Sequence, residues 1–257
     1  MNEFKIASWN VNSLAIRGPQ ALAWFAENHI DVLALQETKV HNDKFPHQWF
    51  SELGYHVVYS GQKTYNGVAL VSRIPLADIY IESEDVLERR MIAATLGDIR
   101  MINLYVPNGS QPGSEKFIYK LSWLEKVTQF IAQELQRYPK LVVLGDFNIA
   151  PQDIDVHDPI EWLNCIHCTP EERAALANIQ ALGLHDSFRV LHPEVQSYSW
   201  WDYRAASFRR NRGLRIDLIL ISHALLNECH NAESDAEPRK GERPSDHAPI
   251  WISLTAP

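Results

Sequence analysis

The sequence predicts an α/β fold in which helices cover sheets of mostly buried strands. Short apolar runs rich in Val, Ile and Leu recur along the chain, and helical periodicity appears between them. No repeat, low-complexity tract or Pro/Ser/Gly linker interrupts the chain, so residues 1–257 are expected to form one domain. Two packed sheets between helical layers suit the number of strands, although the pattern alone leaves a single doubly wound sheet open.

The predicted strands are apolar runs that end abruptly in polar residues. Runs of this length and composition are typical of strands buried on both faces. We predict strands at residues 4–8, 32–35, 101–106, 141–144, 215–221 and 248–254.

Three helices are predicted between these strands. Residues 19–28 and 116–138 place apolar side chains on one face at helical spacing. A third helix is expected to begin at Pro170, because proline suits the first helical position and Thr169 before it suits the N-cap.

The composition limits the class of protein. With 257 residues and 46% hydrophobic content, the chain can bury a sizeable core. The N-terminus lacks a basic segment followed by a clean apolar stretch, and no run approaches the roughly 18 apolar residues of a membrane span. We therefore expect a soluble, unexported protein with no membrane partner.

Charge and cysteine content further limit the class of protein and its cellular compartment. The formal charge of −8 argues against a general nucleic-acid coat, but an acidic metal site with a basic rim is compatible with DNA binding. Three cysteines are too few for a disulfide framework and fit a reducing cytosol. Cys165 and Cys168 form a lone C-x-x-C, which we interpret as two thiols without a metal or redox role.

Carboxylates and amides gather at the predicted strand ends, where loops carry function on a rigid scaffold. Glu37, Asp146 and Asp246 each lie at or just beyond an apolar strand. Any one of them alone is typical of a cap or turn. Together with the amide of Asn10, however, Glu37 and Asp246 offer the oxygen ligands that Mg²⁺ prefers.

The same set suits phosphodiester hydrolysis. Asp146 is the candidate to orient and deprotonate a water molecule. His247, if hydrogen-bonded to Asp217, would be biased towards its charged form and donate to a phosphate oxygen. Asn148 and the Tyr105 hydroxyl would add neutral donors.

Two alternatives remain open for these residues. Asp217 would equally suit an ordinary buried acid paired with Arg215, and Tyr105 would suit a core aromatic residue with a satisfied hydroxyl group.

The motifs that carry these residues resemble the signature blocks of the exonuclease III family of DNA-repair nucleases, within the endonuclease/exonuclease/phosphatase superfamily. The blocks occur in the family's order across nearly the whole chain. They are SWNVN at 8–12, LQETK at 35–39, NLYVP at 103–107, GDFN at 145–148, GLRID at 213–217 and PSDHAP at 244–249.

The resemblance implies a four-layer α/β sandwich of two packed mixed β-sheets flanked by helices. It also implies an enzyme that requires Mg²⁺, with Mn²⁺ as a possible substitute, and leaves a 3′-hydroxyl. The expected substrate is double-stranded DNA with 3′ ends, nicks or abasic sites, cut by a 3′-to-5′ exonuclease and abasic-site endonuclease of DNA repair. A cytoplasmic bacterial monomer, associated with the nucleoid through its substrate, is expected.

The resemblance also assigns roles to residues. Glu37, Asn10 and Asp246 would belong to the metal site, and Asp146 would act on the nucleophile. A second ion near Asp146 and Asn148 stays open. The remaining roles are a transition-state donor at Asn148, a phosphate contact at Tyr105 and a coupled pair of His247 and Asp217.

The segment 200–212 matches the family block before the Asp217 strand and interleaves aromatic residues with arginines. It is expected to contact phosphates and to press an aromatic wedge against an unstacked base. The alternative is an aromatic core segment beside a solvated basic loop. The expected DNA contacts are Asn108, Lys116, Trp201, Arg204, Arg209 and Arg212.

His167 departs from the family pattern, because many relatives that cut at abasic sites carry a small residue there. Its imidazole would occupy the space of a flipped-out abasic sugar, so we expect weakened abasic-site cleavage and retained 3′-end trimming. The alternative is a surface histidine that points away from the site.

Two other functions share the pattern. One is a metal-dependent phosphoesterase of the same superfamily that acts on a non-DNA substrate, and the other is a DNA-end binding module without catalysis. The arginine-rich segment 200–212 favours DNA over the first, and competent side chains at every proposed catalytic position disfavour the second.

Overall fold

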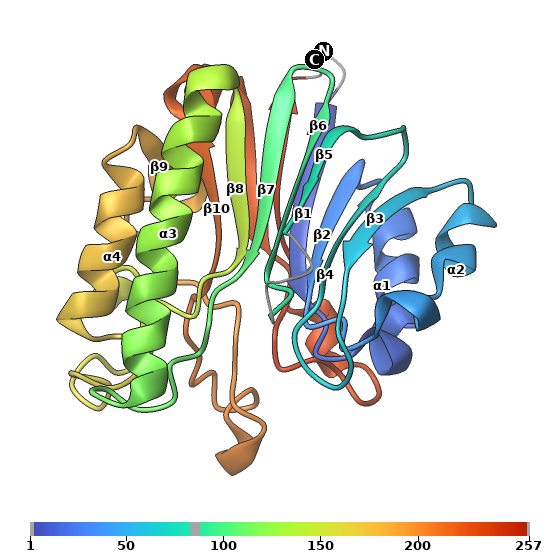
Figure 1. Ribbon diagram of the computed structural model, residues 1–257. Helices are drawn as coiled ribbons and strands as arrows, with labels where there is room; N and C mark the ends of the chain where they lie inside the picture. The colour runs from blue at the N-terminus through green and yellow to red at the C-terminus, as the bar shows by residue number, and fades with distance from the viewer. Residues whose placement is uncertain (1–2, 83–87, 256–257) are drawn as a thin grey trace.

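The computed structural model, which describes residues 3–82 and 88–255, contains two six-stranded mixed sheets packed face to face (Figure 1). This confirms the four-layer sandwich and excludes a single doubly wound sheet. Across the first sheet the order is β11 (Cys229–Ser234), β12 (Ile250–Thr255), β1 (Glu3–Asn10), β2 (Val32–Gln36), β4 (Val68–Ser72) and β3 (His56–Ser60). Across the second it is β5 (Ala77–Ile81), β6 (Met91–Leu96), β7 (Ile99–Tyr105), β8 (Leu141–Asp146), β10 (Asp217–Ser222) and β9 (Leu184–Asp186).

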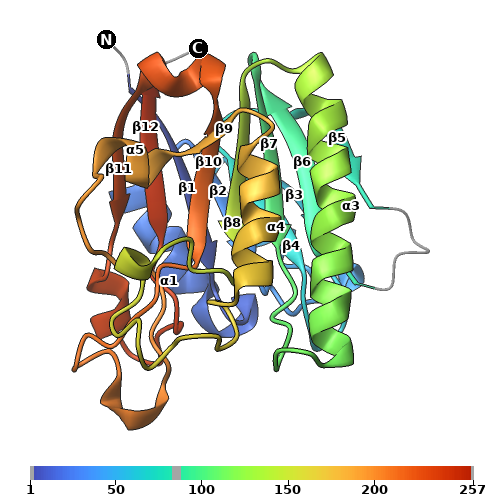
Figure 2. The same cartoon turned by 90° about the vertical axis from the view of Figure 1, so that its left-hand side faces the viewer.

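Helices cover both outer faces of the sandwich (Figures 1 and 2). They bury one apolar cluster beneath each helical layer, and a third cluster fills the space between the sheets. The α-helices are α1 (Leu14–Glu27) and α2 (His47–Ser51) on the first sheet, α3 (Glu115–Arg137) and α4 (Pro170–Gln180) on the second, and the short α5 (Ser187–Leu191). Short 3₁₀ helices are η1 (Asn42–Lys44), η2 (Asp153–Asp155), η3 (Arg204–Ala206), η4 (His223–Glu228) and η5 (Glu237–Lys240).

The predicted helices differ from the observed ones mainly at one end. α1 begins at Leu14, before the predicted residue 19, and therefore includes Pro19. α3 matches the prediction within one residue at each end, and the hydroxyl oxygen of Ser114 caps it by accepting from the backbone N–H of Phe117 at 3.2 Å. α4 begins at Pro170 behind a capping box, which confirms Thr169 as its N-cap.

The six predicted strands are present, but the sheets contain further strands. β3, β5, β9 and β11 lie at sheet edges, where one side is solvated and a continuous apolar run is not required. β4 and β6 are buried interior strands. Their apolar runs lead into no polar site residue, the feature by which the other strands are recognised in the sequence.

Strand register brings the polar residues together at one end of the sandwich. Tyr105 pairs with Asp146 across parallel β7 and β8, and Asp146 pairs with Asp217 across antiparallel β8 and β10. On the facing sheet, Asn10 pairs with Gln36, which directly precedes Glu37. The loops that follow β1, β2, β7 and β8, and the loop that precedes β10, lie at the lower end in Figure 1, opposite the end at which the two termini are drawn.

No helix among the described residues is long and apolar enough to cross a membrane.

Candidate active site

Glu37 and Asp146 come from different sheets and meet at the amide of Asn10. The Nδ2 of Asn10 donates to Oε1 of Glu37 at 2.9 Å and to Oδ2 of Asp146 at 2.9 Å. The three side chains therefore form one polar surface where the two sheets meet, as the sequence predicted.

Backbone geometry at this surface is unusual. Glu37 adopts a positive φ angle of 51°, which residues other than glycine and asparagine rarely adopt. Asn148 adopts the same angle. Gly145, directly before Asp146, has φ +141°, and a Cβ atom there would lie 1.9 Å from the carbonyl oxygen of Leu104. Backbone strain of this kind persists where the surrounding structure holds the chain firmly, and it clusters at functional sites.

Asp146 is almost fully enclosed by donors. Its Oδ1 accepts from the backbone N–H of Asn148 at 2.9 Å, and its Oδ2 accepts from Nδ2 of Asn148 at 3.2 Å as well as from Asn10. Burial raises the pKa of Asp146 to about 7, and the nearby carboxylate of Asp217 acts in the same direction. A carboxylate whose pKa lies near neutrality suits a general base.

His247 is fixed by the pair predicted for it. Its Nδ1 lies 2.8 Å from Oδ2 of Asp217, and its Nε2 lies 3.7 Å from Oδ2 of Asp146. The backbone N–H of Asp217 in turn donates to the hydroxyl oxygen of Ser199 at 3.0 Å. Burial alone would lower the pKa of His247, but the carboxylates of Asp217 and Asp146 outweigh it and raise the pKa to about 10.

The alternative that paired Asp217 with Arg215 is wrong. Arg215 turns away from the site and forms buried ion pairs with Asp155 and Asp186, at 2.7 Å each. The carboxylate of Asp217 therefore pairs with His247 and not with Arg215.

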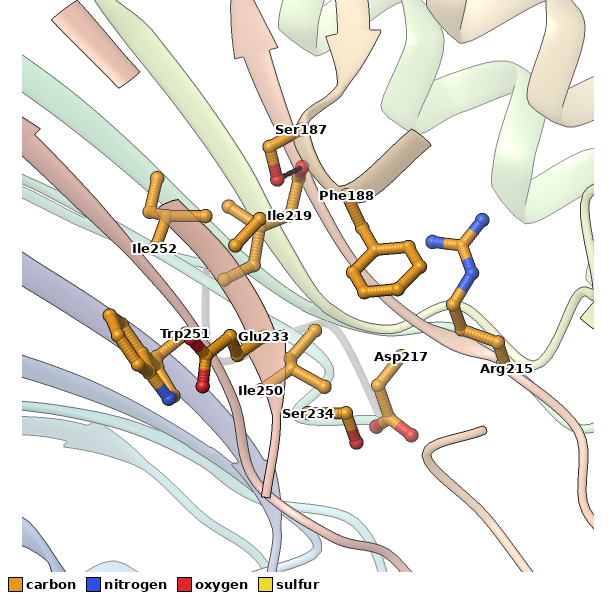
Figure 3. A pocket seen from close by; sticks show the side chains of 11 residues that line it. Ser187, Phe188, Arg215, Asp217, Ile219, Glu233, Ser234, Ile250, Trp251 and Ile252 are labelled. Carbon is orange, nitrogen blue, oxygen red and sulfur yellow. Dashed lines mark hydrogen bonds between the residues drawn. The ribbon is translucent and has the colours of Figure 1, made fainter. Parts of the chain in front are cut away.

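A small cavity lies behind Asp217, between β10 and the β11–β12 edge of the other sheet. Figure 3 shows Asp217 on its wall with Phe188, Ile219 and Ile250, and with Ser187, whose hydroxyl group donates to the carbonyl of Ile219. Its volume is about 20 Å³, which is the space of one water molecule. Oδ1 of Asp217 has no hydrogen-bond partner among the described protein atoms.

Asp246 lies in a separate polar group beside the cluster. Its Oδ1 accepts from Nδ2 of Asn12 at 2.9 Å, and its Oδ2 accepts from Nε1 of Trp200 at 3.0 Å. Both carboxylate oxygens therefore have a donor, and Asn12 links this group to the strand that carries Asn10.

Lys39 is a site residue that was missed in the sequence. Its ammonium group lies 2.9 Å from Oε2 of Glu37 and also donates to Oδ1 of Asn12. Its position two residues after Glu37, inside the same motif, was the available signal.

The donor set fits a divalent cation. Glu37, Asp146 and His247 each offer a ligand atom within 4.8 Å of the others, the one such group among the described ranges. Crowded carboxylates repel one another, and a cation relieves this repulsion. The metal set predicted from the sequence shares Glu37 and Asp146 with this group, whereas His247 was predicted only as a catalytic residue.

Tyr105 faces the same cluster. Burial and the neighbouring charges of Glu37 and Asp146 raise the pKa of its hydroxyl group well above the ordinary value, so the group stays a neutral donor. The guanidinium of Arg90 lies 4.6 Å from the centre of its ring. Tyr105 also packs against the apolar cluster between the sheets, and its hydroxyl group bonds to Glu37, so the alternative of a core aromatic residue with a satisfied hydroxyl group stays open.

Asn148 is held from behind by a buried ion pair. The ammonium group of Lys120 donates to the carbonyl of Asn148 at 2.7 Å, to the carbonyl of Asn108 at 3.2 Å, and to the carboxylate of Glu172. Lys120 lies on the apolar face of α3 between Phe117 and Leu124. A lysine in an apolar stripe is the sequence signal that would have revealed this pair.

Replacing Lys120 with Met is expected to lower the free energy of unfolding by about 3–5 kcal/mol, because it leaves the Glu172 charge buried without its cation. Urea denaturation measures this loss. Lys140→Met is the matched control: Lys140 forms pairs with Asp98 and Glu228 at the surface, where an ion pair contributes about 0–1 kcal/mol. Equal losses in the two variants would show that the Lys120 pair has no special role.

His167 is buried, with 5% of its surface exposed, so the alternative of a surface histidine is wrong. Its Nδ1 lies 2.7 Å from the carbonyl of Asn148, and the centre of its ring lies 6.4 Å from that of Trp162 and 6.2 Å from that of Trp200. Burial and the charge of Lys120 lower the pKa of His167 to about 3, so the imidazole is neutral at physiological pH.

The expected DNA contacts divide into two groups. Trp201 is only 3% exposed and packs edge-on against Tyr198 and Phe208, so it does not present the wedge surface that the segment suggested. The arginines of the segment are accessible. Arg204 and Arg209 are exposed, and Arg212 is partly buried in an ion pair with Glu161.

Asn108 and Lys116 lie on the other side of the cluster. Both line a cavity of about 480 Å³, together with Arg90 and Tyr105. Nδ2 of Asn108 also donates to Oδ1 of Asn148 at 3.3 Å. Of the predicted catalytic residues, Tyr105 lines this cavity.

The fold and the site together define a class of metal-dependent hydrolase. In this class, two packed sheets carry carboxylates, amides and a buried Asp–His pair at their strand ends, around a candidate metal site. The chain belongs to the Endonuclease/Exonuclease/phosphatase family, whose model matches residues 7–247.

Several proteins are similar to this chain over nearly its whole length. The chain is 37% identical to exodeoxyribonuclease III of Haemophilus influenzae, over 97% of this chain and 99% of that protein. A structure of the 3′ phosphatase NExo from Neisseria bound to a product DNA hairpin is 48% identical, with a TM-score of 0.96 over 98% of this chain and 99% of that one. An AP endonuclease from Archaeoglobus fulgidus is 40% identical, with a TM-score of 0.94 over 98% of this chain and 100% of that one.

Proposed function

We propose that this enzyme hydrolyses phosphodiester bonds at the 3′ ends of double-stranded DNA in a Mg²⁺-dependent reaction and leaves a 3′-hydroxyl. The observation that carries the proposal is the line of Asp146, His247 and Asp217 facing Glu37 and Asn10. The relatives named as an exodeoxyribonuclease and a 3′ phosphatase support DNA as the substrate.

The chemistry divides among these residues. Asp146 accepts a proton from the attacking water as the oxygen of that water bonds to phosphorus. The bond from phosphorus to the 3′ oxygen breaks, and the leaving 3′ oxygen takes a proton from solvent to become the 3′-hydroxyl. His247 in its charged form donates Nε2–H to a nonbridging phosphate oxygen, and Tyr105 and Asn148 add neutral donors. Such preorganised donors stabilise the charge that develops on the phosphate.

Glu37 would hold the metal ion together with Asn10 and the neighbouring Asp246, because a charged His247 that donates Nε2–H has no lone pair to offer the ion. When bound, the ion withdraws charge from a phosphate oxygen. Mn²⁺ is expected to substitute, since it accepts the same oxygen ligands. A second ion would have to bind near Asp146 and Asn148. The arginines at 204, 209 and 212, with Asn108 and Lys116, would contact the DNA backbone on either side.

The test uses two end-labelled duplexes, one with a recessed 3′ end and one with an internal stable abasic analogue. Each is incubated with Mg²⁺ or with EDTA. Mg²⁺-dependent shortening of the recessed end supports the proposal. Cleavage of neither duplex would favour the alternative of a phosphoesterase with a non-DNA substrate, and binding of ends without cleavage would favour the binding module.

His167→Gly is expected to raise abasic-site incision relative to 3′-end trimming by about tenfold or more. The buried imidazole lies against Asn148 and Trp200, so its removal opens space for an abasic sugar; a steric clash in a packed site costs about 1–3 kcal/mol. The measurement is the ratio of the two rates on the duplexes above. An unchanged ratio would remove His167 from the determinants of substrate choice.

We also infer a monomer that acts in the bacterial cytoplasm on the DNA of the nucleoid. Sedimentation of the free protein would give the oligomeric state.

A further inference from the structure

The loop between η2 and α4 exposes apolar side chains beside the active site. We name residues 158–165 the apolar finger. Ile160 is 88% exposed and Leu163 is 69% exposed, the two highest values among the exposed large apolar side chains of residues 3–82 and 88–255. Scattered exposed apolar residues are ordinary. Two of them in one short turn next to a substrate-binding site are more informative.

The apolar finger is held in shape by its own backbone. Oδ1 of Asp158 accepts from the backbone N–H groups of Ile160 at 3.1 Å and Glu161 at 3.0 Å. The N–H of Trp162 donates to the carbonyl of Asp158 at 3.1 Å, and the N–H of Cys165 donates to the carbonyl of Trp162 at 3.0 Å. A turn with this many internal hydrogen bonds presents its apolar side chains at little further entropic cost.

The base of the apolar finger adjoins the active site. The ring of Trp162 lies edge-on to that of Trp200, with centroids 6.4 Å apart, and Trp200 donates to Asp246. His157, Trp162 and Trp200 line a pocket of about 170 Å³ with Arg204 and Arg212. In Figure 2 the yellow loop before α4 and the orange loop before β10 lie next to each other at the lower end.

The charges around the apolar finger suit DNA. Its two acids are already engaged, Asp158 with backbone N–H groups and Glu161 with Arg212. Arg209 and Arg210 are exposed, and no ion pair of theirs occurs among the described residues. Arg204 pairs with Asp202 at the surface, where an ion pair is weak and exchangeable. Phosphates would therefore find the arginines of segment 204–212 beside the apolar side chains.

We infer that Ile160 and Leu163 form the wedge that opens the terminal base pair of a DNA duplex at the 3′ end. Apolar side chains inserted at a base step unstack it while nearby cations hold the phosphates. This inference rests on the proposed function. It assigns the unstacking of a base to the apolar finger, because Trp201 is buried and cannot contact a base. The opened pair gives the last phosphodiester access to Asp146 and His247.

The double variant Ile160→Ser/Leu163→Ser tests the inference in single-turnover cleavage of two recessed duplexes, one with a matched and one with a mismatched 3′-terminal pair. Because unstacking costs a few kcal/mol per step and least at a mismatch, the variant should trim the matched end about tenfold more slowly. On the mismatched end it should remain within about twofold of the parent enzyme.

Leu53→Ser/Ile74→Ser is the matched control. Both residues are large, apolar and exposed. Leu53 precedes β3 and Ile74 follows β4, and both strands belong to the first sheet. Thermal melting of all proteins confirms folding, and Ile160→Ser alone serves if the double variant melts early. Equal loss on both duplexes, or no loss on either, would overturn the wedge. Failure of the parent enzyme to cut either duplex would instead overturn the proposed function.

Discussion

Asp146→Asn is expected to lower the single-turnover rate of 3′-end trimming by about 10²–10⁴-fold, the usual contribution of a general base. The asparagine keeps the size of the side chain and can still accept from the backbone N–H of Asn148, but it cannot take a proton. The measurement is cleavage of a recessed duplex at saturating Mg²⁺, next to a binding assay with the same DNA.

The fold should survive this change. Asp146 is buried among other carboxylates, and burial already raises its pKa to about 7, so removing its charge relieves desolvation and repulsion. Thermal melting within a few degrees of the parent protein, with DNA binding retained, is the expected control. A rate within threefold of the parent would show that another group accepts the proton.

Much of this fold follows from local pattern. Strands buried on both faces must be continuous apolar runs, and each such run that ends in a site residue was recognised. Edge strands need fewer buried side chains; in β11, for example, only Cys229 and Ala232 are buried. The start of α1 was placed late because Pro19 suits a first turn, whereas the observed helix continues five residues before it.

The site was predictable as far as strand ends determine it. Asn10, Glu37, Asp146 and Asp217 end or follow strands that register aligns, so their meeting needs no long-range information beyond the sheet order. Ion partners are different, because they depend on which side chains face each other across layers. Arg215 lies two residues from Asp217, but it precedes the strand that begins at Asp217, and its guanidinium group packs against Asp155 and Asp186 instead.

Within segment 200–212, the expected exposure of Trp201 was wrong for a related reason. Aromatic residues interleaved with arginines occur both in exposed nucleic-acid contacts and in small apolar clusters with solvated rims. Trp201 belongs to such a cluster, with Tyr198 and Ala248. Exposure distinguishes the two cases, and exposure is a tertiary property that a single sequence does not display.

Asp217→Asn is expected to lower the rate about 10²-fold at neutral pH, as loss of a buried orienting charge makes its histidine a poorer donor. The Asp217 and Asp146 carboxylates raise the pKa of His247 to about 10 against the effect of burial. Without the Asp217 charge, that pKa should fall by about 1–3 units. The alkaline limb of the pH–rate profile should therefore move to lower pH, since the charged form exists only below the pKa.

The same pair predicts a stability difference with a defined sign. Because the folded pKa of His247 lies above the unfolded value of about 6.5, the stabilisation is fully present below that pH and is lost as pH rises towards about 10. The difference in unfolding free energy between the parent and Asp217→Asn should shrink over this pH range in urea titrations.

The double variant Asp217→Asn/His247→Asn should cleave DNA only slightly more slowly than Asp217→Asn alone, because the two residues act as one unit. Additive losses of rate would mean that the two residues act separately. The hydrogen bond between them would then not serve the reaction.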